Sequence, residues 1–385
     1  MIEERLKAFV GDRQRTLLAV GPMSHTCVNA SIALANKYGA PLMIIASRRQ
    51  IDSAEFGGGY VNQWTTPEFA KYVKSRPGGD GIILARDHGG PWQSPLEVEQ
   101  RLGLGAAMES AKRSYLADIE AGFQMLHIDP SVEIHGELTL IQTLDRVFEL
   151  YEYCWETAER LGQEVRFEIG TEEQKDSVGT VEELEFVLGA IERFCAKNRI
   201  PKPTFVVVQT GTRVLEMRNV GDLPELLAEE GDVPDLRLLA QFSATCKAHG
   251  VFLKQHNTDY LSDEVLRAHP KLGIDSVNVA PEFGVAESRA IFGLCREYGL
   301  KRWEDIFIDL ALASNKWEKW MAPHTQASEL DRALIAGHYV FSHPEFIEAK
   351  NEAAYCLDNK GVNLAEVLEK AVTGSIERYM RAFGY

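Results

Sequence analysis

The chain has 385 residues, of which 45% are hydrophobic and 25% are charged. This is the composition of an ordinary globular protein, and the length allows one large barrel or two domains. The formal net charge of -16 disfavours nucleic acid as a partner, because a polyanion is attracted to basic surfaces.

The six cysteines are far apart and form no Cys-x-x-Cys motif, which is typical of reduced core residues in a cytoplasmic protein. The acidic start at Glu3 and Glu4 does not have the pattern of a signal peptide. No apolar run reaches the roughly 18 residues that a membrane span requires. We therefore expect a cytoplasmic protein that binds neither membranes nor nucleic acids.

Short apolar strands alternate with helical patterns along most of the chain. The predicted strands are 17–21, 41–46, 81–88, 124–129, 165–169, 204–208, 251–254 and 276–280. Helical patterns lie between them, for example from His25 to Tyr38 and from Pro95 to Ala121. This alternation implies parallel strands covered by helices. Eight such units predict a (β/α)8 TIM barrel over residues 1–300, with its active site where the strands end.

A doubly wound sheet is the alternative architecture, but the Gly-x-Gly-x-x-Gly turn typical of that fold does not follow the first strand. From about Lys301 the alternation stops, and aromatic residues punctuate helical patterns with no strand between them. Residues 301–385 are therefore predicted to form a C-terminal helical extension packed on the barrel. This extension serves either as a cap or as an oligomer surface, and a homo-oligomer is expected.

The third predicted strand ends in Asp87 and His88, which precede a Gly-Gly-Pro turn. Because side chains alternate along a strand, His88 is expected to share a face with Leu84 and Arg86 and to point as barrel-interior residues do. Asp87 is either a general acid or base, or a turn residue that caps the glycines, and its spacing favours neither.

A second histidine, His256, ends the seventh predicted strand, and two acids, Glu168 and Glu172, end the fifth. One histidine at a strand end is more often structural than a ligand, but two histidines with carboxylates form a normal zinc set. The sequence therefore favours a divalent metal, with zinc the expected ion, and a coordination position left open for water or substrate. Glu168 and Glu172 could bind the metal, hold a substrate hydroxyl or remain solvated.

Further polar residues lie at or near other strand ends, where they could bind sugar hydroxyls or form turns. They are Asp129, Gln209, Asn257, Asp259 and Asn278. Lys254 raises another chemistry, since a desolvated lysine forms a Schiff base with a ketose. A buried lysine paired with Glu168 or Asp129 is the favoured alternative.

Seven short motifs stand in a characteristic order along the chain. They are Phe56–Tyr60, Asp87–Pro91, His127–Ser131, Ile169–Glu172, Val207–Gly211, His256–Tyr260 and Val279–Pro281. In this order the chain resembles the non-catalytic (accessory) subunit family of class II tagatose-bisphosphate aldolase. The likeness extends to Ser342-His343-Pro344 and Tyr379–Ala382.

That family is similar to the zinc-dependent class II ketose-bisphosphate aldolases, which are TIM barrels. The resemblance implies that Asp87 is the acid/base residue, that His88 and His256 are zinc ligands, and that Asn278 contacts substrate. Two departures stand out. The aldolases' histidine after strand six is replaced here by Gln209, and their small-residue phosphate loop after strand seven is replaced by 257–259. A carboxylate in that loop would repel a phosphate, so a bisphosphate substrate is not implied.

We therefore expect a metal-dependent, aldolase-like enzyme that acts on a ketose or ketose phosphate through an enediolate, by aldol chemistry or by epimerisation. The expected metal ligands are His88, His256 and Glu168, and the expected catalytic residues are Asp87 and Glu172. The alternative is a non-catalytic subunit that stabilises a partner tagatose-bisphosphate aldolase.

Overall fold

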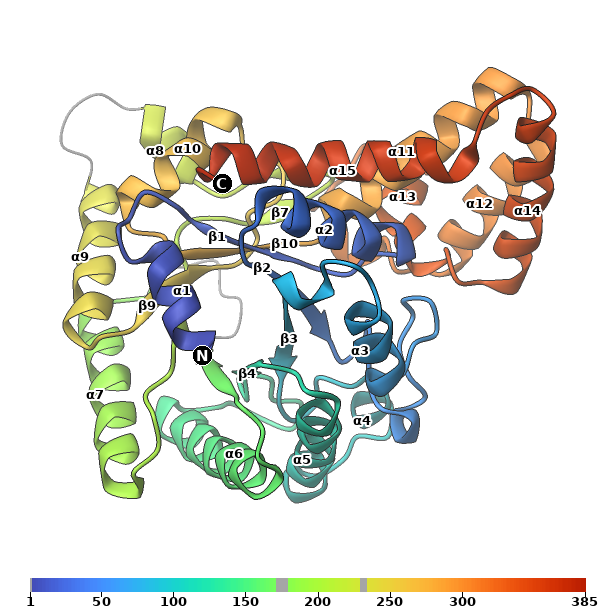
Figure 1. The fold of residues 1–385 in the computed structure, drawn as a ribbon. Coiled ribbons are helices and arrows are strands. Elements are labelled where there is room, and N and C mark those ends of the chain that lie inside the picture. The colour runs from blue at the N-terminus through green and yellow to red at the C-terminus, as the bar shows by residue number, and fades with distance from the viewer. Residues whose placement is uncertain (1, 171–178, 229–233) are drawn as a thin grey trace.

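Eight parallel strands close into a barrel surrounded by helices, as the alternation predicts (Figure 1). The computed structural model describes residues 2–170, 179–228 and 234–385. Around the barrel the strands follow the order β1-β10-β9-β6-β5-β4-β3-β2. Their bounds are β1 Leu17–Val20, β2 Leu42–Ser47, β3 Ile82–Gly89, β4 Met125–Ile128, β5 Arg166–Ile169, β6 Phe205–Val207, β9 Phe252–Gln255 and β10 Ser276–Val279. Each lies within one residue of its predicted bounds at both ends.

The barrel closes where the last strand pairs with the first. Ser276 of β10 lies opposite Leu17 of β1, and the register continues to Val279 and Val20. Because all eight strands are parallel, their carboxyl ends meet at one rim.

Alternate strand residues belong to two different apolar clusters. Leu17 and Ala19 join an inner cluster that also includes Leu6 and Phe9 of α1 (Ile2–Val10), so this first helix packs against the residues inside the barrel. The intervening residues Leu18 and Val20 belong to the larger cluster formed with the surrounding helices. The strands are therefore buried on both faces, as their continuous apolar runs predict.

On β3 the inner face carries Ile83 and Ala85, and Leu84 belongs to the outer cluster. Arg86 points the same way as Leu84 and forms a buried ion pair with Asp118, which lies in α5. The expectation that the face of Leu84 and Arg86 lies inside the barrel is therefore wrong.

The helices that cover the barrel lie between its strands, as the alternation predicts, and the first of them has its predicted bounds. They are α2 His25–Tyr38, α3 Thr66–Lys74, α4 Pro95–Glu99, α5 Leu104–Ala121, α6 Leu140–Leu161, α7 Val181–Asn198, α9 Pro234–Ala248 and α10 Asp263–Leu272. The single helix expected from Pro95 to Ala121 is interrupted between α4 and α5, where Arg101 has a positive φ of 47° and Gly103 caps α5.

The C-terminal region is helical throughout. Helix α11 (Pro281–Tyr298) leads to α12 (Lys301–Ala313), α13 (Glu329–Ala336), α14 (Pro344–Asp358) and α15 (Leu364–Ala382). Helices α12 to α14 share a second apolar cluster with α11, around Trp303, Phe307 and Phe346. Helix α15 then packs against α2, α10 and α11, which places it over the seam between the last and first strands (Figure 1).

Two elements between β6 and α9 were not predicted. A short antiparallel hairpin pairs β7 (Val214–Leu215) with β8 (Arg218–Asn219), and α8 (Leu223–Ala228) follows it. Five of the six cysteines are buried and Cys356 is exposed, and all six are free thiols. Within the described ranges, no helix is both long and apolar enough to cross a membrane.

A buried histidine fixes the loop that follows β9. His269 of α10 contacts the carbonyl of Val265 through Nδ1 at 2.8 Å, and its Nε2 lies 3.0 Å from the side-chain amide of Gln255. That amide also donates to Thr258, and the Gln255 carbonyl accepts from Thr210. These contacts suit a neutral ring that donates from Nδ1 and accepts at Nε2.

This histidine should make the protein sensitive to acid. Burial lowers the pKa of His269 to about 4. Between pH 6.5 and 4 this imidazole is therefore protonated in the unfolded chain and neutral in the folded chain. Stability then falls as the pH falls through this window. The free energy of unfolding in urea, measured at pH 7 and pH 5, should drop by about 2 kcal/mol less in His269→Gln than in the unmodified protein.

The matched control is His343→Gln, since His343 is exposed on the surface. This variant should keep the full acid loss. Equal losses in the unmodified protein and in His269→Gln would contradict the assignment.

Candidate active site

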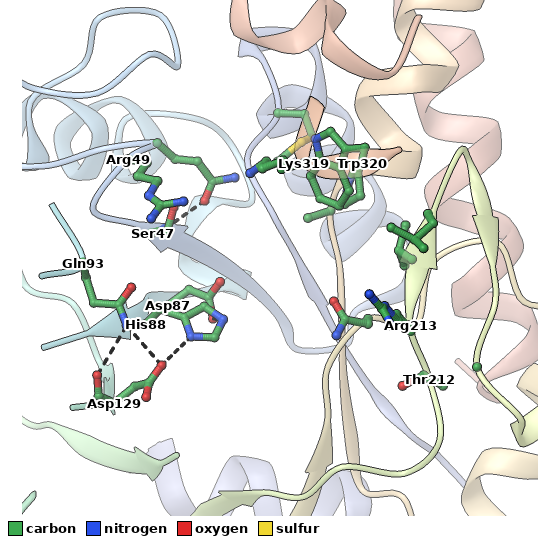
Figure 2. Close-up of a pocket in the computed structure, with 18 of the residues that line it drawn as sticks. Ser47, Arg49, Asp87, His88, Gln93, Asp129, Thr212, Arg213, Lys319 and Trp320 are labelled. Carbon is green, nitrogen blue, oxygen red and sulfur yellow. Dashed lines mark hydrogen bonds and ion pairs between the residues drawn. The ribbon is translucent and has the colours of Figure 1, made fainter. Parts of the chain in front are cut away.

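A cavity of about 750 Å³ lies at the carboxyl ends of the barrel strands. Its wall includes residues at the ends of several strands and residues of the C-terminal region (Figure 2). Those used below are Arg49, Asp87, His88, Gln93, Asp129, Gln209, Asn257 and Lys319.

Three imidazole rings gather at this end of the barrel. His88 is in β3, His127 is in β4 and His256 follows β9. The three ring centroids are 5.0 to 5.4 Å apart. The structure therefore brings the two predicted histidines together and adds a third, His127, to which the sequence assigned no role.

A bulge in β3 carries His88 into this group. The pairing of β3 with β4 shifts register between Arg86 and Gly89, and His88 has a positive φ of 45°. Simple alternation would turn His88 outward with Arg86, but the bulge breaks the alternation. The backbone N–H of His88 donates to Nδ1 of His127 at 3.1 Å, which helps to hold the bulge. A positive φ in a residue other than glycine is unfavourable and is often found at functional sites.

Two aspartates border the imidazoles. Oδ1 of Asp87 accepts a hydrogen bond from the amide of Asn278 at 3.1 Å and lies 3.7 Å from Nδ1 of His127. Oδ2 of Asp129 is 2.6 Å from Nδ1 of His88, and its other oxygen accepts from the Ser131 hydroxyl (Figure 2). Asp129 thus orients His88, as carboxylates orient metal-binding histidines in many proteins.

Glu168 lies between a lysine and the histidine group. Its Oε2 pairs with the buried amine of Lys254, and its Oε1 is 3.2 Å from Nε2 of His256 and 3.6 Å from Nδ1 of His127. Lys254 is 0% exposed, so this is a buried ion pair rather than an amine open to substrate. The structure therefore agrees with the paired lysine and gives no support to Schiff-base chemistry.

Burial and charge compete at each of these groups. Burial would raise the pKa of Asp87, but the charge of His88, followed by the nearby ring of His127, outweighs it and holds that pKa well below its usual range. Burial disfavours the charge on His88, yet Asp87 and Asp129 raise the His88 pKa to about 9. Burial lowers the pKa of His256 to about 4. Burial opposes ionisation of Glu168, but the charge of Lys254 lowers its pKa to about 2.

The donor set fits a divalent cation. Two overlapping groups have ligand atoms within 4.8 Å of one another, and both include His127. One adds Asp87 and His256, and the other adds His88 and Asp129. Nε2 of His127 is buried without a hydrogen-bond partner in the part of the chain that the structure describes. Imidazole with carboxylate suits zinc. The three acids Asp87, Asp129 and Glu168 outnumber the two positive charges of Lys254 and protonated His88, which favours a bound cation.

The other predicted residues have defined places. The Gln209 carbonyl accepts from the N–H groups of Thr210 and Gly211, so it shapes the turn after β6. Asn257 lines the cavity, whereas Asp259 is buried and accepts from the backbone of Ala280. Burial and the nearby Glu282 raise the pKa of Asp259 to about 7. Glu172 lies outside the described residues.

Besides His127, sequence reasoning gave no role to Gln93, Arg49 and Lys319. Gln93 donates to Asp129 at 3.3 Å, and Arg49 and Lys319 line the cavity. The signal for His127 was available, because it lies in the fourth strand two residues before Asp129. No local pattern marked Lys319, which belongs to the region without strands.

No family sequence model matches the chain, and no curated protein matches it in sequence. Solved structures match it in fold. A structure described as a probable tagatose 6 phosphate kinase from Sinorhizobium meliloti 1021 has a TM-score of 0.76 at 21% identity, covering 96% of this chain and 100% of that one. A fructose-bisphosphate aldolase from Campylobacter jejuni has a TM-score of 0.53 at 12% identity, over 99% and 92% of the two chains.

The fructuronate-tagaturonate epimerase of Cohnella laeviribosi has a TM-score of 0.50 at 13% identity, over 96% and 81% of the two chains. The likeness is one of fold. At these identities it establishes the barrel with its additional helices and nothing about the reaction.

The pair of Lys254 and Glu168 gives a direct test of the site's buried charge. Lys254→Met leaves Glu168 buried without its counter-ion, which should destabilise the protein by roughly 3–5 kcal/mol. Lys254→Met combined with Glu168→Gln removes both charges and should recover much of that loss. Urea unfolding of the two single variants and the double variant measures the coupling. Additive losses would show that the two side chains do not stabilise each other.

Proposed function

We propose that this protein is a metal-dependent sugar enzyme with aldolase-like chemistry, acting on a ketose or ketose derivative through an enediolate. The observation that carries the proposal is the convergence of His88, His127 and His256 with Asp87 and Asp129 beside a cavity at the barrel rim. A TIM barrel places catalytic groups at this rim.

The metal set differs from the sequence-based assignment. We propose that the ion is held by imidazoles of the three-histidine group with Asp87 or Asp129, because these residues form the two sets of close ligand atoms. Glu168 then serves as a charged neighbour, since one of its oxygens is engaged by Lys254. A bound divalent ion supplies Lewis-acid polarisation of a ketose carbonyl and stabilises the negative charge that develops on it.

The chain's own residues would handle the proton and the geometry. The carboxylate of Asp87 lines the cavity beside the histidine group, so where the metal is held by the other set it is placed to accept a proton from the substrate and return it. The Asn278 amide donates to Asp87 and fixes its orientation. Asp129 does the same for His88.

The fold neighbours bear names from three chemistries: an aldolase, an epimerase and a kinase. Imidazole-rich donors favour carbonyl chemistry over phosphoryl transfer, which uses Mg²⁺ held mostly by oxygen ligands. Aldol cleavage and epimerisation of a ketose share the enediolate, so both remain within the proposal.

Metal content tests the first part of the proposal. Protein purified without added metal should contain one divalent ion per chain by elemental analysis. His256→Ala and His127→Ala should each lose it, because each removes a ligand. The surface variant His343→Ala is the matched control and should keep the metal. A metal-free native protein that also fails to bind added zinc would reject the enzyme hypothesis and favour a binding subunit.

Hydrogen exchange tests the chemistry without requiring the final product. In D2O, followed by proton NMR, epimerisation should exchange the hydrogen next to the ketose carbonyl, and aldol cleavage should place deuterium in the ketone fragment. In both reactions the enediolate takes up a proton from solvent. Asp87→Asn should slow the exchange by roughly 10²- to 10⁴-fold. Native metal content with no exchange across a panel of ketoses, ketose phosphates and ketouronates would contradict enediolate chemistry.

A further inference from the structure

Two cationic side chains line the cavity away from the histidine group. Arg49 follows β2, and Lys319 lies in the short 3-10 helix Glu318–Trp320 between α12 and α13. Figure 2 shows both on the upper side of the cavity, with His88 and Asp129 below them. Residues far apart in the sequence thus place two positive charges on one wall.

Neither cation is paired with an acid in the part of the chain that the structure describes. Among the described residues, no carboxylate lies within ion-pair distance of Arg49 or Lys319. Lys319 instead lies over the rings of Trp320 and Tyr339, at 4.6 and 5.4 Å from their centroids. The side chains of Arg49 and Lys319 are both exposed to solvent. Partial desolvation at the cavity wall, and then the charge of Arg49, lower the pKa of Lys319 to about 8. An anion placed between the two side chains would be attracted to both positive charges.

The backbone beneath Arg49 is held by buried charges. The neighbouring Arg48 is fully buried and pairs with Asp52 at 2.8 Å and with Glu97 at 2.5 Å. The side chain of Gln50 accepts from the N–H of Ser47, which closes the turn. Arg49 is therefore presented to the cavity from a rigid loop.

The segment that carries Lys319 is held by the β7–β8 hairpin. The N–H of Glu216 donates to the carbonyl of Trp320 at 2.8 Å. The Glu216 carboxylate accepts from the N–H of Ala322 at 3.2 Å. The C-terminal region and the loop after β6 thus form one wall of the cavity. Because this wall is already ordered, binding a ligand to it should cost little conformational entropy.

We propose that Arg49 and Lys319 form a subsite for the terminal anionic group, phosphate or carboxylate, of an open-chain sugar whose carbonyl end lies at the histidine group. This inference rests on the proposed function for the position of the carbonyl. The cavity has room for such a ligand, since pockets of about 300–1,000 Å³ hold small molecules. Its acidic end would hold the metal, and its basic wall would hold the anion.

Other charges also line the cavity. Arg213 and Asp222 face it from the segment between β6 and α8. Arg213 adds positive charge, whereas Asp222 would disfavour an anion placed close to it. Arg49, which follows β2, and Lys319, in the C-terminal region, are therefore the two cations that we assign to the anion.

Calorimetric titration of the metal-free protein tests the subsite independently of turnover. Three ligands are compared: a ketohexose 6-phosphate, a hexuronate and the neutral ketohexose. Lys319→Met and Arg49→Met should each weaken the affinity for the preferred anionic sugar by roughly 10- to 100-fold. The affinity for the neutral sugar should stay the same in both variants. Lys319→Arg should keep most of the affinity. Lys316→Met, an exposed lysine three residues earlier, is the control and should bind as the unmodified protein does.

The two anionic ligands distinguish the source of the charge, because the tighter one identifies phosphate or carboxylate as the group that is bound. Folded variants that bind both anionic sugars as well as the unmodified protein would overturn the subsite, as would an unmodified protein that prefers the neutral sugar or binds none of the three. If no sugar is turned over but the two variants still lose affinity for the anion, the proposed function fails and the subsite stands. If an anionic sugar is turned over and kcat/KM is unchanged in both variants, the proposed function stands and the subsite fails.

Discussion

Closure of the parallel barrel is the constraint on which the rest of the structure depends. Pairing of β10 with β1 fixes all eight strands in one direction, so their carboxyl ends share a rim. His88, His127 and His256 are far apart in the sequence and meet only because of this closure. The barrel body is filled with apolar side chains, so the polar groups concentrate where the strands end.

The rim also carries a cost, because it buries many charges. Arg86 pairs with Asp118, and Lys254 pairs with Glu168, all of them within the protein interior. A buried ion pair is weak support for stability, since an apolar pair of similar volume often does as well. These pairs are better explained by the way they position neighbouring loops and charges. Arg86 also donates to the carbonyl of Ile51 and so anchors the loop after β2, and Glu168 sets the charge beside the histidine group.

The fold could be predicted from the sequence because its signal is repeated. Eight apolar runs, each followed by a helical pattern, specify strands to within one residue even though single short runs are ambiguous. The β7–β8 hairpin escaped prediction because its turn residues, Glu216 and Met217, have positive φ angles of 50° and 58° without the asparagine or glycine usual there. Tertiary contacts with Trp320 and Ala322 support that turn instead.

The site could be predicted in part. Asp87, His88 and His256 were found because they end apolar runs, and the structure places His88 and His256 in one group with Asp87 beside them. His88 was expected to point as barrel-interior residues do, and it joins the histidine group. The expectation that Leu84 and Arg86 share its face was wrong, because the bulge in β3 that separates them leaves no mark in local composition. His127 was overlooked because it lies inside a strand pattern, where a histidine reads as a core residue.

The C-terminal region gives the cavity a wall with a lysine, Lys319, that the strand ends do not supply. Strands and their short loops place the histidine group with little freedom, because β3, β4 and β9 are fixed by the barrel's register. Lys319 is placed by contacts of a surface segment, which tolerate change far better than a closed sheet does. The histidine group and the wall that carries Lys319 can therefore vary independently. Under the proposed function, related barrels could keep one carbonyl chemistry and change the end of the sugar that they recognise.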